Sequence, residues 1–161
     1  MASQGIPRHM PALAERRARA ATAVGRRPRA PVVVTEEEPE LNGPTDARIG
    51  AADPFLKPTF GLAGTPEILR AVLDTGRRTA VLVGFETDVC VYQSAVGLLD
   101  RSLRALVVED AVISPGEMHA RGLDRMRDAG ARLTHCKALG YEWVRTVEAA
   151  NVLPRPAPFP L

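Results

Sequence analysis

The sequence predicts an α/β fold in which a parallel sheet lies between two layers of helices. Three short apolar runs without polar alternation, at residues 31–35, 79–84 and 105–108, are typical of strands covered on both faces, and residues 131–134 predict a last strand. Helix-forming segments separate these runs, and such alternation builds a parallel sheet through right-handed crossovers. Because ligands in these folds bind at the carboxyl ends of the strands, we expect the functional residues there.

The first half of the chain contains two predicted helices, a strand and a long loop. Residues 11–24 are rich in Ala, Arg and Leu, which favour a helix. The run at 31–35 predicts a buried strand, and residues 36–54 mix Glu, Pro, Asn and Gly without periodicity, as loops do. Thr65 is a candidate N-cap for a helix over residues 66–76 with one apolar face.

The second half of the chain repeats the alternation of strand and helix. Residues 79–84 carry the strongest strand signal, and a turn at 85–88 leads into a helix. The apolar face of that helix holds Val91, Ala95, Leu98 and Leu99. The remaining predicted elements are a strand at 105–108, a helix at 117–129, a strand at 131–134 and a helix at 141–149.

We expect a single domain over residues 1–153. A chain of 161 residues can bury one sizeable core, whereas two domains would each bury little. Prolines at alternate positions predict an extended tail over residues 154–161. The first ten residues do not resemble a secretory signal, and no apolar run approaches the roughly 18 residues that a membrane span needs. We therefore expect a cytoplasmic protein without a membrane partner.

The basic residues do not favour a nucleic-acid partner. The net charge is only +2, and the arginines that cluster at residues 16–29 have no interleaved aromatics, so a solvated helix face is the favoured interpretation. Lysine, in contrast, occurs only at Lys57 and Lys137. A desolvated lysine can exchange a proton, whereas a guanidinium effectively cannot, so these two positions are informative.

Both cysteines, Cys90 and Cys136, are expected to be free thiols. Cys90 follows a buried strand and a short turn, which places it in the first turn of a helix at the carboxyl edge of the sheet. Helix N–H groups there favour a thiolate with a depressed pKa and could stabilise an oxyanion. From topology alone, a small buried hydrophobic side chain is an equally good interpretation.

The segment Val83-Gly84-Phe85-Glu86-Thr87-Asp88-Val89-Cys90-Val91 resembles the nucleophile turn of isochorismatase-like cysteine hydrolases. This family includes nicotinamidases and N-carbamoyl amide hydrolases. The resemblance continues through Val108-Glu109-Asp110-Ala111-Val112 and covers residues 10 to 150. It implies a Rossmann-like strand order, a nucleophilic Cys90, a cis peptide bond between Phe85 and Glu86, and an oxyanion hole formed by the Glu86 and Cys90 amides.

Lys57-Pro58-Thr59-Phe60 matches the segment that carries the family's lysine. The resemblance implies that Lys57 helps to activate the thiol, as a nearby ammonium would by lowering the thiol pKa. Phe60 and Glu36 are candidate substrate contacts, although a solvated acidic loop is the commoner role for a residue such as Glu36. The stretch around Glu36 contains no histidine, so we expect no metal site of the nicotinamidase type and no cofactor.

The resemblance further implies a catalytic aspartate at the end of an apolar first strand. Residues 1–10 do not form such a strand, and no acid precedes Glu15, so we expect either an N-terminally shortened member with a gap in its sheet or another segment that fills the gap. Poor amide turnover is then expected, with Glu36 as a candidate substitute base.

Two functions remain open. The first is a cysteine-dependent hydrolase of a small amide-like or related metabolite. The alternative is a catalytically impaired or inactive family member that acts as a structural or oligomeric binding protein. A homo-oligomer is expected in both cases.

Overall fold

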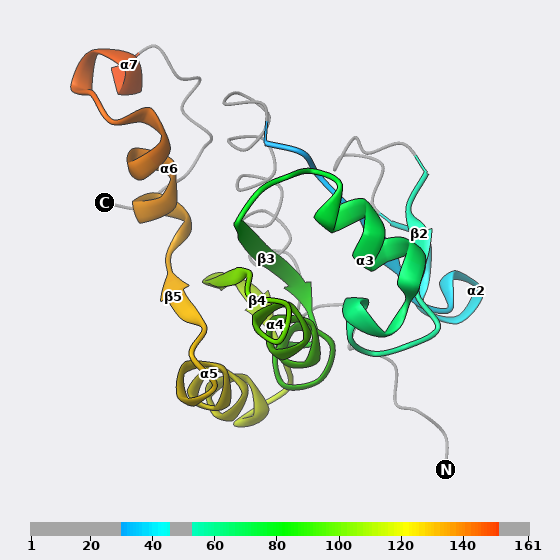
Figure 1. Ribbon diagram of the computed structural model, residues 1–161. Coiled ribbons are helices and arrows are strands. Elements are labelled where there is room, and N and C mark those ends of the chain that lie inside the picture. Colours follow the sequence, from blue (N-terminus) through cyan, green and yellow to red (C-terminus); the bar gives the residue numbers. More distant parts are fainter. Residues whose placement is uncertain (1–29, 46–52, 152–161) are drawn as a thin grey trace.

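The computed structural model describes residues 30–45 and 53–151 (Figure 1). The helix predicted at 11–24 and the tail predicted at 154–161 lie outside the described residues.

The main sheet is parallel and has three strands in the order β3, β4, β5. Strand β3 spans Thr79–Phe85, β4 spans Arg104–Ile113, and β5 spans Arg132–Thr134. The pairing of β3 with β4 shifts between Leu82 and Gly84, and Gly84 has a φ of 125°, a conformation that L-residues with side chains rarely adopt. Beyond the shift, the end of β3 pairs with the end of β4, so both strands reach the same carboxyl edge.

Helices cover both faces of this sheet, as the sequence predicts. On one face, α4 (Tyr92–Leu99) and α5 (Met118–Asp128) pack on the strands. That core consists of Val91, Ala95, Ala105, Val107, Val112, Leu123, Met126 and Ala131. On the other face, α6 (Cys136–Val144) packs over a core of Val108, Ala111, Cys136 and Leu139, and α7 (Val147–Asn151) follows it. Adjacent residues of β4 thus enter opposite cores, as a strand covered on both faces requires.

A second, smaller sheet carries the other half of the site. Strand β1 (Thr35–Glu36) pairs in parallel with β2 (Phe55–Leu56), and the short helix α2 (Pro39–Asn42) follows β1. A 3₁₀ turn at Leu62–Gly64 then leads to helix α3 (Pro66–Leu73), whose N-cap is Thr65. The four residues of the small sheet include no fully buried one.

Several predicted boundaries were wrong, each for a physical reason. The strand predicted over 31–35 comprises only Thr35–Glu36, because pairing with β2 begins there. Strand β4 extends five residues past 108, since its polar residues Glu109 and Asp110 interrupt the apolar signal without interrupting the strand. The last predicted helix begins at Cys136 and divides into α6 and α7 at Arg145, which adopts a left-handed conformation with φ 66°.

Candidate active site

Cys90 lies just beyond the carboxyl end of β3, where the sequence places it. The Phe85–Glu86 peptide bond is cis, and the chain then forms a π-helical turn, Thr87–Val91, that continues into α4. The Val91 amide donates to the Glu86 carbonyl over 2.9 Å, which closes this wide turn. The thiol is half-buried rather than sealed in the core, so it is accessible to a small reactant.

Neighbouring elements hold this nucleophile turn in place. Thr87 is fully buried, and its hydroxyl is 2.9 Å from Nδ1 of His119 on α5. The Ser114 hydroxyl, just after β4, hydrogen-bonds the Asp88 carboxylate. Gly122 of α5 lies against Asp88 so closely that a Cβ at Gly122 would be 2.8 Å from the Asp88 backbone nitrogen. Sequence patterns did not single out these supports, since each depends on contact between distant segments.

Lys57 follows β2 and points its ammonium toward the thiol. Its side chain is 6% exposed, and Nζ lies 3.9 Å from the Cys90 sulfur. Nζ also donates to the carbonyls of Thr59 over 2.6 Å and Phe60 over 3.0 Å, and to Glu37 Oε2 over 3.1 Å. A buried charge needs such partners. The structure therefore brings together the lysine and the cysteine that the resemblance singled out.

Glu37 joins Cys90 and Lys57 as the third group of this cluster, whereas the sequence predicted a role for its neighbour Glu36. Glu37 Oε2 lies 3.4 Å from the Cys90 sulfur. The Glu36 carboxylate instead accepts hydrogen bonds from the Thr45 amide over 2.7 Å and the Thr45 hydroxyl over 2.9 Å, which closes its own loop. Glu36 is the last residue of β1 and Glu37 lies in the bend that follows it, so the two adjacent acids face different partners.

The Phe60 side chain, the other candidate contact, is 54% exposed. Its carbonyl, rather than its ring, contributes to the cluster by accepting from Lys57.

The expectation of a depressed thiol pKa was wrong in its net direction. Burial raises the pKa of the Cys90 thiol, and the charge of Lys57 and a hydrogen bond from the Glu86 backbone amide lower it. The charge of Glu37 and its hydrogen bond with the thiol raise the pKa further. A raised pKa disfavours the thiolate, so attack by Cys90 would need a base. Burial, with the charges of Asp88 and Glu37, also raises the pKa of the Glu86 carboxyl.

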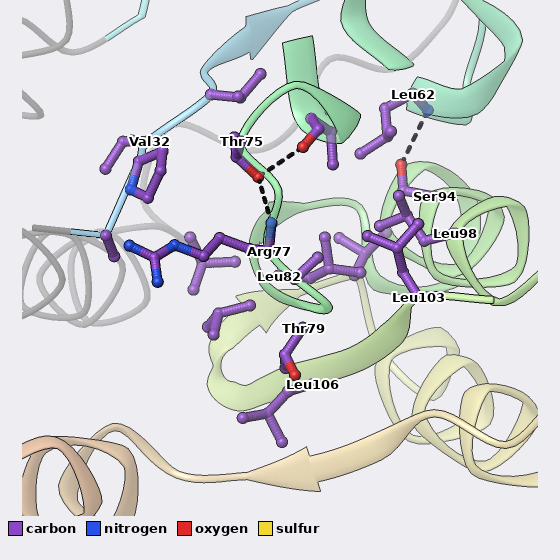
Figure 2. Close-up of a pocket in the computed structure, with 18 of the residues that line it drawn as sticks. Val32, Leu62, Thr75, Arg77, Thr79, Leu82, Ser94, Leu98, Leu103 and Leu106 are labelled. Atoms are coloured by element: carbon purple, nitrogen blue, oxygen red, sulfur yellow. Dashed lines mark hydrogen bonds between the residues drawn. The ribbon is translucent and has the colours of Figure 1, made fainter. Parts of the chain in front are cut away.

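A cleft of about 670 Å³ adjoins the cluster (Figure 2). Residues 30–33 and Thr35 line one side, and β3 lines the other, while Lys57 and Cys90 also contribute to its wall. Leu82, Leu98 and Leu103 lie together on one side, and the Leu62 amide donates to the Ser94 hydroxyl over 3.1 Å. Within residues 30–45 and 53–151, no strand lies between the two sheets where this cleft runs.

Over the described ranges, no group of three or more His, Cys, Asp or Glu side chains is arranged to hold a metal ion. The helices of this part of the chain are all too short or too polar to cross a membrane.

Known proteins are similar to this chain in sequence and in architecture. The sequence model of the isochorismatase domain matches residues 5–138. Isochorismatase domain-containing protein 2 from Xenopus laevis is 38% identical over 110 residues, which are 65% of this chain and 52% of that protein. The chain therefore spans about half the length of such curated relatives.

Solved structures give the same fold. YcaC from Escherichia coli, described as an octameric hydrolase of unknown specificity, superposes with a TM-score of 0.78 at 22% identity, over 87% of this chain and 74% of that one. N-carbamoylsarcosine amidase from Thermoplasma acidophilum gives a TM-score of 0.60 at 25% identity, over 77% and 83% of the two chains. Since the domain model covers most of the sequence and the fold agrees, this chain belongs to the isochorismatase family.

Proposed function

We propose that this protein is a cysteine-dependent hydrolase of a small amide-like metabolite. The observation that carries the proposal is the convergence of a half-buried thiol, a buried ammonium 3.9 Å away and a carboxylate 3.4 Å away, beside a cleft. Nucleophile, charge and proton acceptor in mutual contact are what covalent acyl transfer requires. The likeness to an N-carbamoylsarcosine amidase supports a substrate with an amide-type carbonyl.

The reaction begins with attack of the Cys90 sulfur on the carbonyl carbon. We propose that the Glu86 and Cys90 amides donate to the developing oxyanion, a role supported by the hydrogen bond between the Glu86 amide and the sulfur. Lys57 supplies positive charge beside the reacting sulfur. Collapse of the intermediate releases the amine and leaves a thioester, which water hydrolyses to the acid and the free thiol.

The raised thiol pKa favours a second candidate, a family member that retains the fold and binds without turnover. Since YcaC is described as an octamer, we further propose that this chain self-associates, which either function would permit.

Turnover separates the two candidates. The purified protein is assayed against a panel of small amides that includes nicotinamide and N-carbamoyl compounds, with Cys90→Ala and Cys136→Ala as matched variants. The hydrolase predicts release of amine or ammonia that Cys90→Ala abolishes and Cys136→Ala retains, because Cys136 is buried in the core under α6. Turnover that survives Cys90→Ala would refute the proposal.

A further inference from the structure

We infer that Glu37 is the group that exchanges a proton with the Cys90 thiol, as base for the attack and as acid for the departing amine. The use of this exchange in hydrolysis rests on the proposed function. The exchange itself follows from contacts around the sulfur.

The first contact is direct. The thiol donates to Glu37 Oε2 over 3.4 Å, a normal separation for a hydrogen bond that involves sulfur. The carboxylate is well ordered by Lys57, which donates to the same oxygen over 3.1 Å. The Glu37 side chain is 29% exposed, so it lies at the edge of the site, where a water molecule can reach it. Proton exchange needs this combination of contact and access.

Lys57 cannot itself be the acceptor in this arrangement. An ammonium has three N–H donors and no lone pair, and Nζ has three oxygen partners: two backbone carbonyls and Glu37. All three partners are acceptors, so each takes an N–H of the ammonium and none supplies a proton to it. Lys57 therefore fixes the carboxylate and stabilises negative charge, while Glu37 has the lone pair that receives the proton.

Other nearby acids are occupied elsewhere. The Glu36 carboxylate is held by Thr45, and the Asp88 carboxylate is held by Ser114. In the described part of the chain, Glu37 is the carboxylate to which the thiol donates. Glu37 directly follows β1, Lys57 directly follows β2, and Cys90 lies in the turn after β3, so the fold assembles the acid, the lysine and the cysteine from separate segments.

The proposed cycle balances atoms and protons. Glu37 takes the S–H proton as the sulfur forms a bond to the carbonyl carbon and the π electron pair moves to oxygen. As the C=O bond re-forms, the C–N bond breaks and the carboxylic acid of Glu37 returns the proton to the departing nitrogen. Glu37 then takes a proton from a water molecule as the water oxygen attacks the thioester carbon. Glu37 returns this proton to the sulfur as the C–S bond breaks. The net change is amide plus water to acid plus amine.

The test compares two readouts in Glu37→Gln, with Glu40→Gln, at an exposed acid of α2, as the matched control. One is the pH midpoint of Cys90 alkylation by iodoacetamide, followed in a Cys136→Ala background, which needs no substrate. The other is amide hydrolysis. Glu37→Gln removes a negative charge and an acceptor from the thiol, so the midpoint should fall by about 1 pH unit and alkylation at neutral pH should accelerate. Hydrolysis should nevertheless fall about a hundred- to ten-thousand-fold, as expected when a positioned base is lost.

Faster alkylation together with slower hydrolysis distinguishes the loss of proton exchange from a structural defect. A structural defect would not make the thiol more reactive and the enzyme less active at the same time. Glu40→Gln should shift neither readout. An unchanged alkylation midpoint in Glu37→Gln would overturn the inference whether or not any amide is hydrolysed. A lowered midpoint with undiminished turnover would overturn the base role. A lowered midpoint in a protein that hydrolyses nothing on the panel would keep the exchange and refute the proposed function.

Discussion

Replacement of Gly122 by Ala tests how closely α5 supports the nucleophile turn. A Cβ at Gly122 would be 2.8 Å from both the Cα and the nitrogen of Asp88 and 2.9 Å from its Cβ. Two of these atoms belong to the backbone and cannot rotate away, so α5 or the turn must shift. Overpacking of this kind costs about 1–3 kcal/mol in the free energy of unfolding. The improved helix propensity of Ala offsets about 1 kcal/mol of that cost.

Gly140→Ala is the matched control, because Gly140 also lies inside a helix, α6, and its added Cβ would have no neighbour within 4 Å. It receives the same gain in helix propensity without the clash, so the two variants should differ by the overpacking cost alone. For a domain of this size, about 1–3 kcal/mol corresponds to a difference of about 2–12 °C in Tm, measured by circular dichroism. The rate of Cys90 alkylation should also change in Gly122→Ala but not in Gly140→Ala. Equal Tm values for the two variants would refute the close contact.

Three further predictions concern the charges and thiols of the site. Cys90 should react with iodoacetamide faster than Cys136 near neutral pH, because Cys136 is only 4% exposed; equal rates would contradict the placement of the nucleophile. Lys57→Ala should raise the pH midpoint of Cys90 alkylation, since the lysine charge lowers the thiol pKa, whereas Lys137→Ala should leave the midpoint unchanged. Glu86→Gln should stabilise the fold at neutral pH but not below the unfolded-state pKa of the carboxyl. Burial raises the folded-state pKa of Glu86, so its ionisation penalises the fold as pH rises through that value, and chemical denaturation at two pH values measures the difference.

Much of the main sheet was predictable because its strands are continuous apolar runs. Val107 and Val108 belong to opposite cores, and a strand whose sequence does not alternate with polar residues predicts burial on both faces. The small sheet was less predictable, since Val32 and Val33 carry a strand signal but line the cleft without pairing. Here tertiary context overrides local propensity.

Some residues of the candidate site could likewise be predicted from the sequence, and others could not. Cys90, Lys57 and the cis Phe85–Glu86 bond were accessible through local motifs that resemble a known family. Glu37 was not, because the choice between two adjacent acids depends on the bend after β1 and on contacts with Lys57 and Cys90, which are distant in the sequence. The direction of the thiol pKa was also inaccessible, since burial outweighs the helix and lysine effects only in the folded chain.

The location of Glu37 and Lys57 beside the β1–β2 pair has a consequence for ligand affinity. Cys90 is anchored to a three-stranded sheet with cores on both faces, whereas its two partners are supported by a pair of two-residue strands with no fully buried member. Few buried contacts imply a low free energy of local opening. A ligand that contacts both Cys90 and the residues beside the β1–β2 pair binds only those conformers in which the two sheets are packed together. Its apparent dissociation constant is therefore the intrinsic constant divided by the fraction of molecules in such conformers. Mutations that only strengthen the small sheet would thus tighten binding without touching the ligand.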